Sequence, residues 1–321
     1  MRVLITRPIP ETGVALLREA GHAVNVLPHD RPASPEELRA ASEGVEGLLT
    51  MLTDKVDAAF LAERPRLKAI ANYAVGFNNI DVGACTERRI GVTNTPDVLT
   101  SATAEVAWTL LMAAARRAGE AERALRAGLW DGWGPLQYLG VDVVDQTLGV
   151  VGAGRIGARF AQMAAGFNMR LLYCNRRPSV AMEALGATLV SFDELLARAD
   201  FVSLHVPLTA ETRHMMGAAA FSRMKPSAVL INTARGAVID EAALVEALRR
   251  RQIFAAGLDV FDEEPKLHPG LYELENVVIL PHIGSATVRT RQVMSRLAAE
   301  NLLAMLGDRR PKTPVNPELW G

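Results

Sequence analysis

The chain has 321 residues, of which 49% are hydrophobic and 22% are charged, a composition typical of a globular protein with room for two domains. Its 35 Lys and Arg residues nearly balance its 36 Asp and Glu residues, so the formal net charge is -1. This balance argues against binding to nucleic acid or to an anionic membrane surface, because both need a clustered basic excess.

Two cysteines, Cys85 and Cys174, are too few for a disulfide framework or for a cysteine-based metal cluster. The longest apolar stretch, residues 106–115, falls short of the roughly 20 residues that a membrane span needs. The first residues have too short an apolar run for a signal peptide and are typical of a strand. We therefore expect a cytoplasmic protein of a reducing compartment, with no metal site and no membrane partner.

Short β-branched strands alternate with helices over the first hundred residues. Strands are predicted at residues 3–6, 24–27, 47–51, 67–71 and 90–94. Ser34, followed by Glu37 three residues later, has the capping-box signature of a helix start. Strands separated by helices indicate a parallel sheet that is covered on both faces. Residues 100–117 then predict a long, Ala-rich helix that leaves this first domain.

A second series of strands and helices begins at residue 147. Strands are predicted at residues 147–151, 170–174, 201–205, 228–232, 255–259 and 277–280. Ser191 with Glu194, and Asp240, are helix-start signals between these strands. A last helix at about residues 286–306 precedes a proline-rich tail. Two α/β domains are expected, and the pattern alone does not assign the last helix to either of them.

A glycine-rich turn, GAGRIG at residues 152–157, directly follows the strand at residues 147–151. An apolar-faced helix follows the turn, and a second strand ends about 20 residues further on, which is the context that a dinucleotide site requires. Gly152 permits the tight turn, Gly154 lets the backbone approach a pyrophosphate, and Gly157 lets helix and strand pack closely. A glycine-rich turn without a ligand is the alternative.

Asn175, Arg176 and Arg177 follow the second strand of this series, at the position that distinguishes the two nicotinamide cofactors. An acidic residue there hydrogen-bonds the ribose 2′-OH of NAD, whereas arginine suits the 2′-phosphate of NADP. The sequence therefore favours NADP(H) while still admitting NAD(H). The alternative is that the two arginines form only a solvated basic turn.

Three further polar segments, at residues 232–236, 259–265 and 281–286, follow strands of the second series. Open α/β sheets bind their ligands at such strand ends, so Arg235, Glu264 and His282 are expected at one crevice. Arg offers a planar fork to a carboxylate, His donates a proton to a carbonyl oxygen, and a carboxylate orients His and favours its charged form. Each residue has a non-catalytic explanation by itself, but together they indicate reduction of a 2-keto acid.

The chain resembles the D-2-hydroxyacid dehydrogenases over nearly its whole length. The likeness lies in residues 72–81 (NYAVGFNNID), 93–96 (TNTP), GAGRIG, 232–236, 264–265 and 281–287. Within the family the chain is most similar to the glyoxylate/hydroxypyruvate reductases, because Trp130, Trp133 and Pro135-Leu136 repeat their pattern. Asn175 replaces the usual acidic residue of the family.

The resemblance implies two Rossmann-like, doubly wound parallel-sheet domains, with the cofactor domain inserted in the substrate domain. The flavodoxin-like substrate domain would comprise residues 1–97 and 287–321, and the dinucleotide-binding domain residues 98–286.

The resemblance also implies roles for individual residues. Arg235, Glu264 and His282 match the catalytic trio, and Arg235 also binds the substrate. Val75 and Gly76 match a loop whose backbone N–H groups hold the substrate carboxylate. The matches to cofactor contacts are Thr103, Arg155 and Ile156 at the pyrophosphate, His205, Pro207 and Thr212 near the adenosine, and Thr233, Arg235, Asp259, His282 and Gly284 at the nicotinamide end.

Trp133 matches a residue that reaches over the substrate site of the partner subunit in a homodimer, although it could instead anchor the dimer interface. The resemblance thus implies a homodimer that reduces glyoxylate or hydroxypyruvate to glycolate or D-glycerate, preferably with NADPH. D-3-phosphoglycerate dehydrogenase, or another D-2-hydroxyacid dehydrogenase, is the alternative enzyme. A dinucleotide-sensing co-regulator, which keeps the catalytic trio, is the alternative from a different class.

Overall fold

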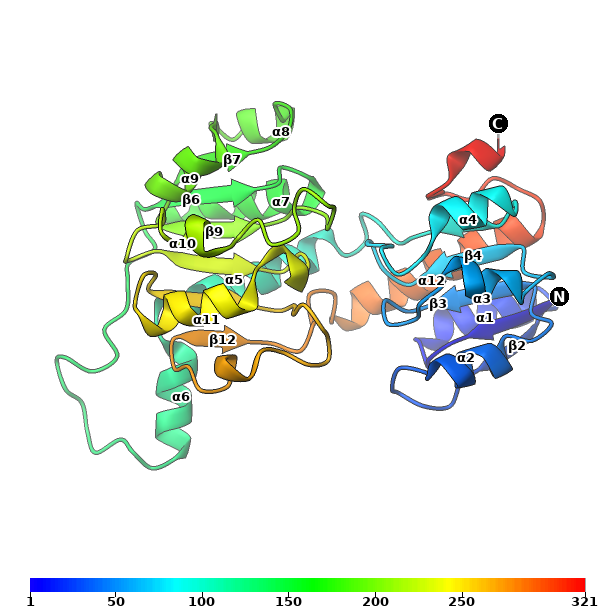
Figure 1. The fold of residues 1–321 in the computed structure, drawn as a ribbon, viewed down its shortest axis with the longest axis horizontal. Coiled ribbons are helices and arrows are strands. Elements are labelled where there is room, and N and C mark those ends of the chain that lie inside the picture. The colour runs from blue at the N-terminus through cyan, green and yellow to red at the C-terminus, as the bar shows by residue number, and fades with distance from the viewer. Residues whose placement is uncertain (321) are drawn as a thin grey trace. The chain divides into compact units, whose positions relative to one another are not determined.

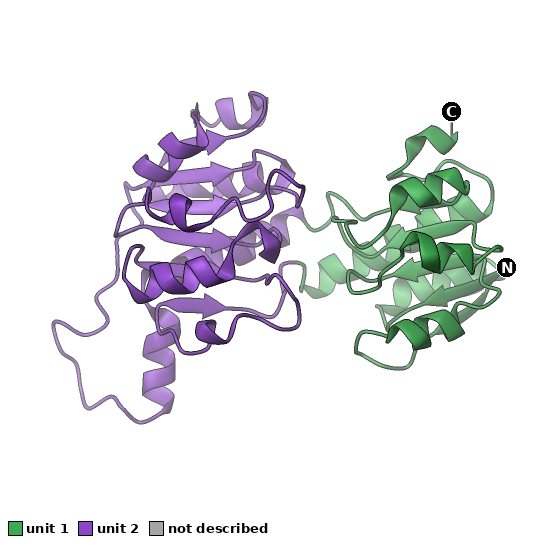
Figure 2. Cartoon of the chain, viewed as in Figure 1, with its two compact units in different colours: residues 1–99, 285–321 green, residues 100–284 purple. Residues whose placement is uncertain are grey.

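The computed structural model describes residues 1–320, which form two compact units (Figure 2). Unit 1 comprises Met1–Leu99 together with the segment from Ser285 onward, and unit 2 comprises Thr100–Gly284. The chain therefore leaves unit 1 once and returns to it once. No helix among the described residues has the length and apolar character to cross a membrane.

Unit 1 is built on a parallel sheet of five strands in the order β2-β1-β3-β4-β5 (Figure 1). The strands are β1 (Arg2–Ile5), β2 (Ala23–Val26), β3 (Gly47–Thr50), β4 (Ala69–Asn72) and β5 (Gly91–Thr93). The helices are α1 (Glu11–Glu19), α2 (Pro35–Ala41), α3 (Ala58–Ala62), α4 (Val82–Glu87) and α12 (Val288–Leu306). This strand order is that of flavodoxin-like sheets, which bind ligands beyond the carboxyl ends of their strands.

A local capping signal accounts for one helix of unit 1, and long-range contacts place another. The side chain of Ser34 accepts a hydrogen bond from Glu37 N at 3.2 Å, and Ser34 N donates to the Glu37 carboxylate at 2.8 Å, so the predicted capping box is confirmed. The last helix, α12, packs against α1, where Ser295 Oγ accepts from Gly13 N at 3.0 Å and donates to Pro10 O at 2.6 Å. The structure thereby assigns α12 to unit 1, whereas the pattern of strands and helices did not show which domain this helix joins.

Unit 2 is built on a parallel sheet of seven strands in the order β12-β11-β10-β9-β6-β7-β8. The strands are β6 (Thr147–Val151), β7 (Arg170–Cys174), β8 (Thr188–Leu189), β9 (Phe201–Leu204), β10 (Val229–Asn232), β11 (Ala255–Leu258) and β12 (Val277–Ile279). The helices are α5 (Thr100–Ala115), α6 (Ala118–Arg126), α7 (Arg155–Met163), α8 (Val180–Glu183), α9 (Phe192–Arg198), α10 (Ala218–Phe221) and α11 (Glu241–Arg249). This is the Rossmann strand order with one added strand. The chain adds strands outward from β6 on one side and from β9 on the other, so the strand order reverses between β6 and β9.

Short 3₁₀ segments complete the described chain. They are η1 (Ala164–Phe167), η2 (Gly236–Val238), η3 (Pro269–Leu271) and η4 (Pro317–Trp320). The expected fold class, two α/β domains with doubly wound parallel sheets, is confirmed.

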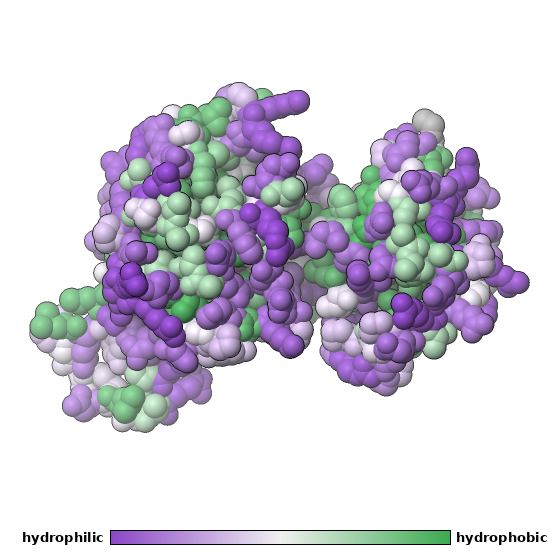
Figure 3. Space-filling model, in the orientation of Figure 1, coloured by the Kyte–Doolittle hydropathy of each residue, from purple (hydrophilic) through white to green (hydrophobic). Residues whose placement is uncertain are grey.

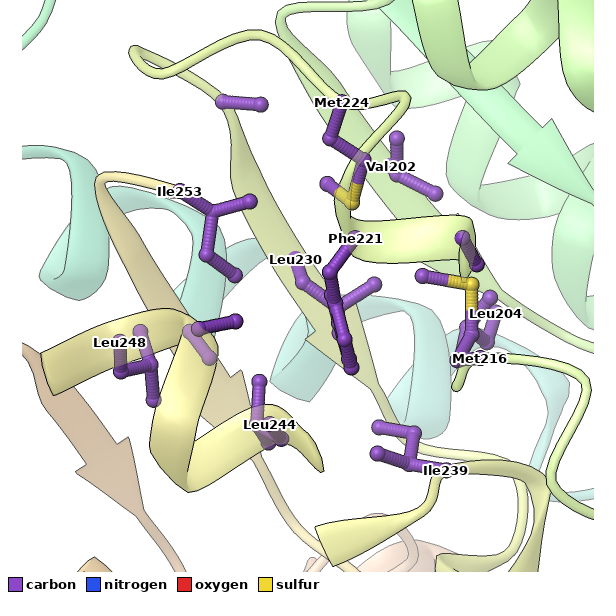
Figure 4. Close-up of a cluster of buried hydrophobic side chains, with 14 of the residues drawn as sticks. Val202, Leu204, Met216, Phe221, Met224, Leu230, Ile239, Leu244, Leu248 and Ile253 are labelled. Atoms are coloured by element: carbon purple, nitrogen blue, oxygen red, sulfur yellow. The ribbon is translucent and has the colours of Figure 1, made fainter. Parts of the chain in front are cut away.

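Hydrophobic clusters cover both faces of the unit 2 sheet. On one face, Phe221 of α10, Leu230 of β10 and Leu244 of α11 point toward one another (Figure 4). On the other face, the indole of Trp108 packs against the ring of Phe160 and donates to its carbonyl oxygen at 3.0 Å. Complete burial of one such side chain contributes about 1.5–3 kcal/mol, so these clusters make the sheet a rigid support for the loops at its strand ends.

An arm formed by residues 118–142 extends away from the sheet of unit 2 (Figure 1). It consists of α6, which buries no side chain, and of a following segment without helix or strand. Hydrophobic residues lie on its surface (Figure 3). The exposed large ones are Leu125, Leu129, Trp130, Trp133, Leu136 and Leu139.

Candidate active site

The glycine-rich turn joins β6 to α7 at the point where the strand order reverses. Gly152 has φ +95°, and a methyl group there would lie 2.8 Å from the carbonyl group of His205. A methyl group on Gly157 would lie 2.2 Å from Gly152 O, whereas one on Gly154 would meet no atom within 4 Å. The turn is therefore tightly packed on its inner side and open at Gly154, as the approach of a pyrophosphate requires.

Two further observations fit a dinucleotide along these strand ends. Gly154 is the N-cap of α7 and supplies no side chain, so the positive end of this helix is left to a ligand. Beyond β10, Thr233 Oγ1 is buried and has no hydrogen-bond partner among residues 1–320. A buried hydroxyl is normally hydrogen-bonded, so its position fits a polar ligand group.

Thr103, Asp259 and Gly284 lie together although they are far apart in the sequence. A methyl group on Gly284 would lie 3.2 Å from Asp259 Oδ2 and 3.4 Å from Thr103 Cγ2. The structure thus groups one residue predicted for the pyrophosphate with two predicted for the nicotinamide end.

Asn175, Arg176 and Arg177 follow β7 and line a pocket of about 590 Å³. Asn175 Oδ1 accepts from Ala153 N at 3.4 Å, and Asn175 Nδ2 donates to Arg177 O at 2.9 Å. Asn175 therefore ties the basic turn to the glycine-rich turn. A hydrogen bond from Thr209, together with the charge of Arg176, lowers the pKa of Glu211, so one carboxylate faces this basic turn.

His205, Pro207 and Thr212 belong to the loop that follows β9. The His205 ring is buried against Phe160, its Nε2 lies 2.9 Å from Ser203 Oγ, and burial lowers its pKa to about 3. Thr212 Oγ1 donates to Pro207 O at 2.7 Å and thereby closes the loop. The ring of His205 is thus turned toward the core, and its carbonyl group packs against the glycine-rich turn.

His282 and Glu264 form the central pair of the site, with His282 Nδ1 at 2.7 Å from Glu264 Oε2. The other carboxylate oxygen accepts from Phe261 N at 3.0 Å. Burial opposes ionisation of Glu264, but the hydrogen bond and charge of His282 hold the pKa of Glu264 below its ordinary value. His282 has φ +54°, a left-handed conformation that is uncommon for this residue type and clusters at functional sites.

Asp259, at the end of β11, holds the loop that carries His282. Its two carboxylate oxygens accept from Ile283 N and Gly284 N, each at 2.7 Å. Burial raises the pKa of Asp259, while these two hydrogen bonds oppose that rise. The carboxylate therefore fixes the backbone directly after the histidine.

Arg235 follows β10 and is partly buried beside the same pair. Burial lowers the pKa of Arg235 below its ordinary value, and the negative charge of Glu264 partly offsets this decrease. A methyl group on Gly236 would lie 1.8 Å from the carbonyl carbon of Phe261, so the loops after β10 and β11 are in direct backbone contact. Unit 2 thus brings Arg235, Glu264 and His282 to one place, as the sequence predicted.

In unit 1, the loop after β4 carries Val75 and Gly76. Asn94 Nδ2 donates to Val75 O at 2.7 Å, and Asn72 Nδ2 donates to Gly76 O at 2.8 Å. Within residues 1–320, the N–H groups of Val75 and Gly76 donate to no protein acceptor that the structure records. No role was predicted for Asn72 or Asn94, because an asparagine near the end of a strand is also an ordinary turn residue.

Trp133 lies on the arm and is 84% exposed. The described part of the chain contains no group of three or more His, Cys, Asp or Glu side chains that could hold a metal ion.

A family model, a curated relative and two solved structures all match this chain. The family model described as "D-isomer specific 2-hydroxyacid dehydrogenase, NAD binding domain" matches residues 108–284. A glyoxylate reductase from Thermococcus onnurineus is 49% identical, over 99% of this chain and 96% of the relative. The crystal structure of the TT0316 protein from Thermus thermophilus is 47% identical, with a TM-score of 0.92 over 98% of this chain and 100% of that one. An NADPH-dependent glyoxylate/hydroxypyruvate reductase from Sinorhizobium meliloti, solved with NADP and malonate, is 34% identical, with a TM-score of 0.85 over 98% of this chain and 97% of that one.

Proposed function

This chain belongs to the D-isomer specific 2-hydroxyacid dehydrogenase family, and on that premise we propose that it reduces glyoxylate to glycolate and hydroxypyruvate to D-glycerate. The observation that carries the proposal is the 2.7 Å contact between His282 and Glu264 beside Arg235, at the carboxyl ends of neighbouring strands. The names of the relatives supply the substrates.

When bound, the nicotinamide dinucleotide supplies a hydride to C2 of the keto acid and is oxidised as the C=O double bond is reduced. His282 donates the proton that completes the hydroxyl group, through Nε2, because Glu264 occupies Nδ1. The Glu264 carboxylate stabilises the charged imidazolium before this transfer. Arg235 presents its planar guanidinium to the substrate carboxylate and to the keto oxygen.

The dinucleotide would lie across the carboxyl ends of the unit 2 strands. Gly152, Gly154 and Gly157, with the N-terminus of α7, would hold the pyrophosphate. The unpartnered hydroxyl of Thr233 would bond the nicotinamide end. Thr103, Arg155, Ile156, His205, Pro207, Thr212, Asp259 and Gly284 complete the proposed set of contacts.

The preferred cofactor in this proposal is NADPH. The end of β7 carries Asn175 in place of a carboxylate, and Arg176 and Arg177 line the adjoining pocket with positive charge. Charge-assisted hydrogen bonds contribute roughly 1.5–3 kcal/mol each, so kcat/KM for NADPH should exceed that for NADH by roughly 10- to 100-fold. Asn175→Asp combined with Arg176→Ala should reduce the use of NADPH and leave the use of NADH equal or better. Equal efficiency of both cofactors in the wild-type protein would refute the preference.

In unit 1, the N–H groups of Val75 and Gly76 would bind the substrate carboxylate. Their carbonyl groups are held by Asn94 and Asn72, which fixes the direction of the peptide units. Backbone N–H groups without protein acceptors suit an anion.

We also assign this protein a homodimeric state, with the arm at the interface. Trp133, Leu136 and Leu129 are 84%, 82% and 73% exposed, and a clustered apolar surface of this kind marks an interaction site. Light scattering should give twice the chain mass, and Trp133→Ala with Leu136→Ala should shift the mass toward the monomer. A cytoplasmic location is proposed as well, because Cys85 and Cys174 are both free thiols.

A panel of 2-keto acids tests the proposed activity. Purified protein should show its highest kcat/KM with glyoxylate or hydroxypyruvate, and a much lower value with 3-phosphohydroxypyruvate. Preference for the phosphorylated acid would favour the 3-phosphoglycerate dehydrogenase alternative. Dinucleotide binding without turnover of any member of the panel would overturn the enzyme proposal in favour of a co-regulator.

A further inference from the structure

Glu241 is the first residue of α11 and lies outside the catalytic trio. Its two carboxylate oxygens accept from two backbone N–H groups, Asp262 N at 2.9 Å and His268 N at 2.8 Å. Both donors belong to the loop that follows β11, and Glu264 lies between them in the sequence. One side chain therefore holds both ends of the segment that carries the carboxylate partner of His282.

Between these two anchors, Leu267 packs against the hydrophobic cluster of unit 2, but residues 263–266 do not. Lys266 N donates to Glu263 O at 2.9 Å, which makes residues 263–266 a tight turn. The turn lies at the surface, although the Glu264 side chain itself is only 31% exposed. Packing against the core therefore does not fix the turn. Within the turn, the Glu264 carboxylate accepts from Phe261 N and contacts His282, and these are its hydrogen bonds among residues 1–320.

Other charged groups face the same segment from neighbouring elements. From the loop after β9, His214 Nε2 lies 3.2 Å and Arg213 Nη2 lies 3.7 Å from Asp262 Oδ2. The pair itself is faced by Arg235, whose charge acts on Glu264, and by Asp259, which interacts with the charge of His282. A substitution of Glu241 alone changes none of these charged groups chemically.

We propose that Glu241 is a positioning residue for the reduction, because it keeps the Glu264 carboxylate at hydrogen-bonding distance from His282, where the negative charge of Glu264 favours the imidazolium form. The inference rests on the proposed function, since it assumes that His282 is the acid. A carboxylate is required because it can accept two N–H groups, whereas an amide keeps only one acceptor oxygen.

The test compares Glu241→Gln with Glu246→Gln, which lies on the same helix and pairs with Arg250 on the surface. In Glu241→Gln, kcat for glyoxylate should fall by about 10- to 100-fold, as expected for a misplaced catalytic group, while KM and the cofactor Kd stay within about twofold. The alkaline loss of activity should move to lower pH by about one unit. Glu246→Gln should match the wild type in all of these.

A double variant separates positioning from a general loss of structure. If Glu241 acts through Glu264, Glu241→Gln should add no further pH shift in the Glu264→Gln background. A full additional shift, or a fall in kcat with the pH profile of the wild type, would overturn the positioning role.

Amide hydrogen exchange distinguishes failure of the positioning role of Glu241 from failure of the proposed function. The amides of Asp262 and His268 should exchange faster in Glu241→Gln than in the wild type, whether or not glyoxylate is the substrate. Unchanged exchange would overturn the anchoring itself. An inactive wild type with faster exchange in the variant would overturn the proposed function, and with it the catalytic part of the inference, and leave the anchoring intact.

Discussion

The proposed proton donation by His282 relies on its 2.7 Å contact with Glu264. His282→Ala should lower kcat by roughly 10²- to 10⁴-fold, the usual contribution of a general acid. Glu264→Gln keeps the shape of the side chain but removes the charge that stabilises the imidazolium, so the alkaline limb of the pH–rate profile should move to lower pH. Steady-state rates between pH 6 and 10 provide the check. An active Gln variant with the wild-type profile would show that the pair does not set the protonation of His282.

A buried histidine makes the stability of unit 2 dependent on pH. Burial lowers the pKa of His205 to about 3, whereas an unfolded histidine titrates near 6.5. Between these values the unfolded chain binds more protons, so this residue makes unfolding easier as the pH falls below 6.5. From pH 7 to pH 5 the loss should be about 2 kcal/mol.

Urea unfolding at the two pH values, followed in the wild type and in His205→Gln, measures this loss. The pH-dependent difference should shrink in the variant, because glutamine does not titrate. An undiminished difference would mean that other groups cause the pH dependence.

At this scale the sequence predicted that Arg235, Glu264 and His282 lie together, but not which groups hold the surrounding loops. Arg235, Glu264 and His282 stand in local motifs after strands, which is why their joint position could be inferred. Glu241 and Asn72 act through backbone atoms whose position only the folded chain defines. No local pattern distinguishes either residue from an ordinary helix-start acid or turn asparagine.

Two glycines of the turn between β6 and α7 should respond differently to substitution by alanine, because Gly157 is tightly packed and Gly154 faces open space. A methyl group on Gly157 would overlap Gly152 O at 2.2 Å, so Gly157→Ala should destabilise unit 2 by about 1–3 kcal/mol or more. Gly154→Ala faces open space and should leave the free energy of unfolding unchanged, yet it should weaken dinucleotide binding because the methyl group fills the pyrophosphate approach.

Thermal melts and cofactor titrations of the two variants form a matched pair. The Tm should fall only for Gly157→Ala, whereas Gly154→Ala should bind the dinucleotide more weakly at a normal Tm. Normal dinucleotide affinity in Gly154→Ala would place the pyrophosphate elsewhere.

Elements with a buried face were predictable, and elements without one were not. Strands β6 and β7 have the predicted bounds, because runs of mostly apolar residues mark them. Helix α6 has only one large apolar residue, Leu125, which is exposed, and β8 has two exposed residues. Neither element buries a side chain in a core, and neither was predicted.

The whole molecule consists of two parallel-sheet units with different strand orders in one chain. Alternation of strands and helices predicted both sheets, but it could not assign α12 to unit 1, because that assignment depends on contacts with α1, nearly 300 residues away in sequence. Each unit places its polar loops at the carboxyl ends of its strands, where such sheets bind ligands. The proposed reduction follows from that placement together with the family to which the chain belongs.

The most direct test of this account is the stoichiometry of the reaction with glyoxylate. Purified protein would be incubated with NADPH and glyoxylate, and both the NADPH consumed and the glycolate formed would be quantified. Equal molar amounts of the two are expected, with both formed roughly 10²- to 10⁴-fold more slowly in His282→Ala. NADPH consumption without glycolate, or no consumption above the protein-free control, would contradict it.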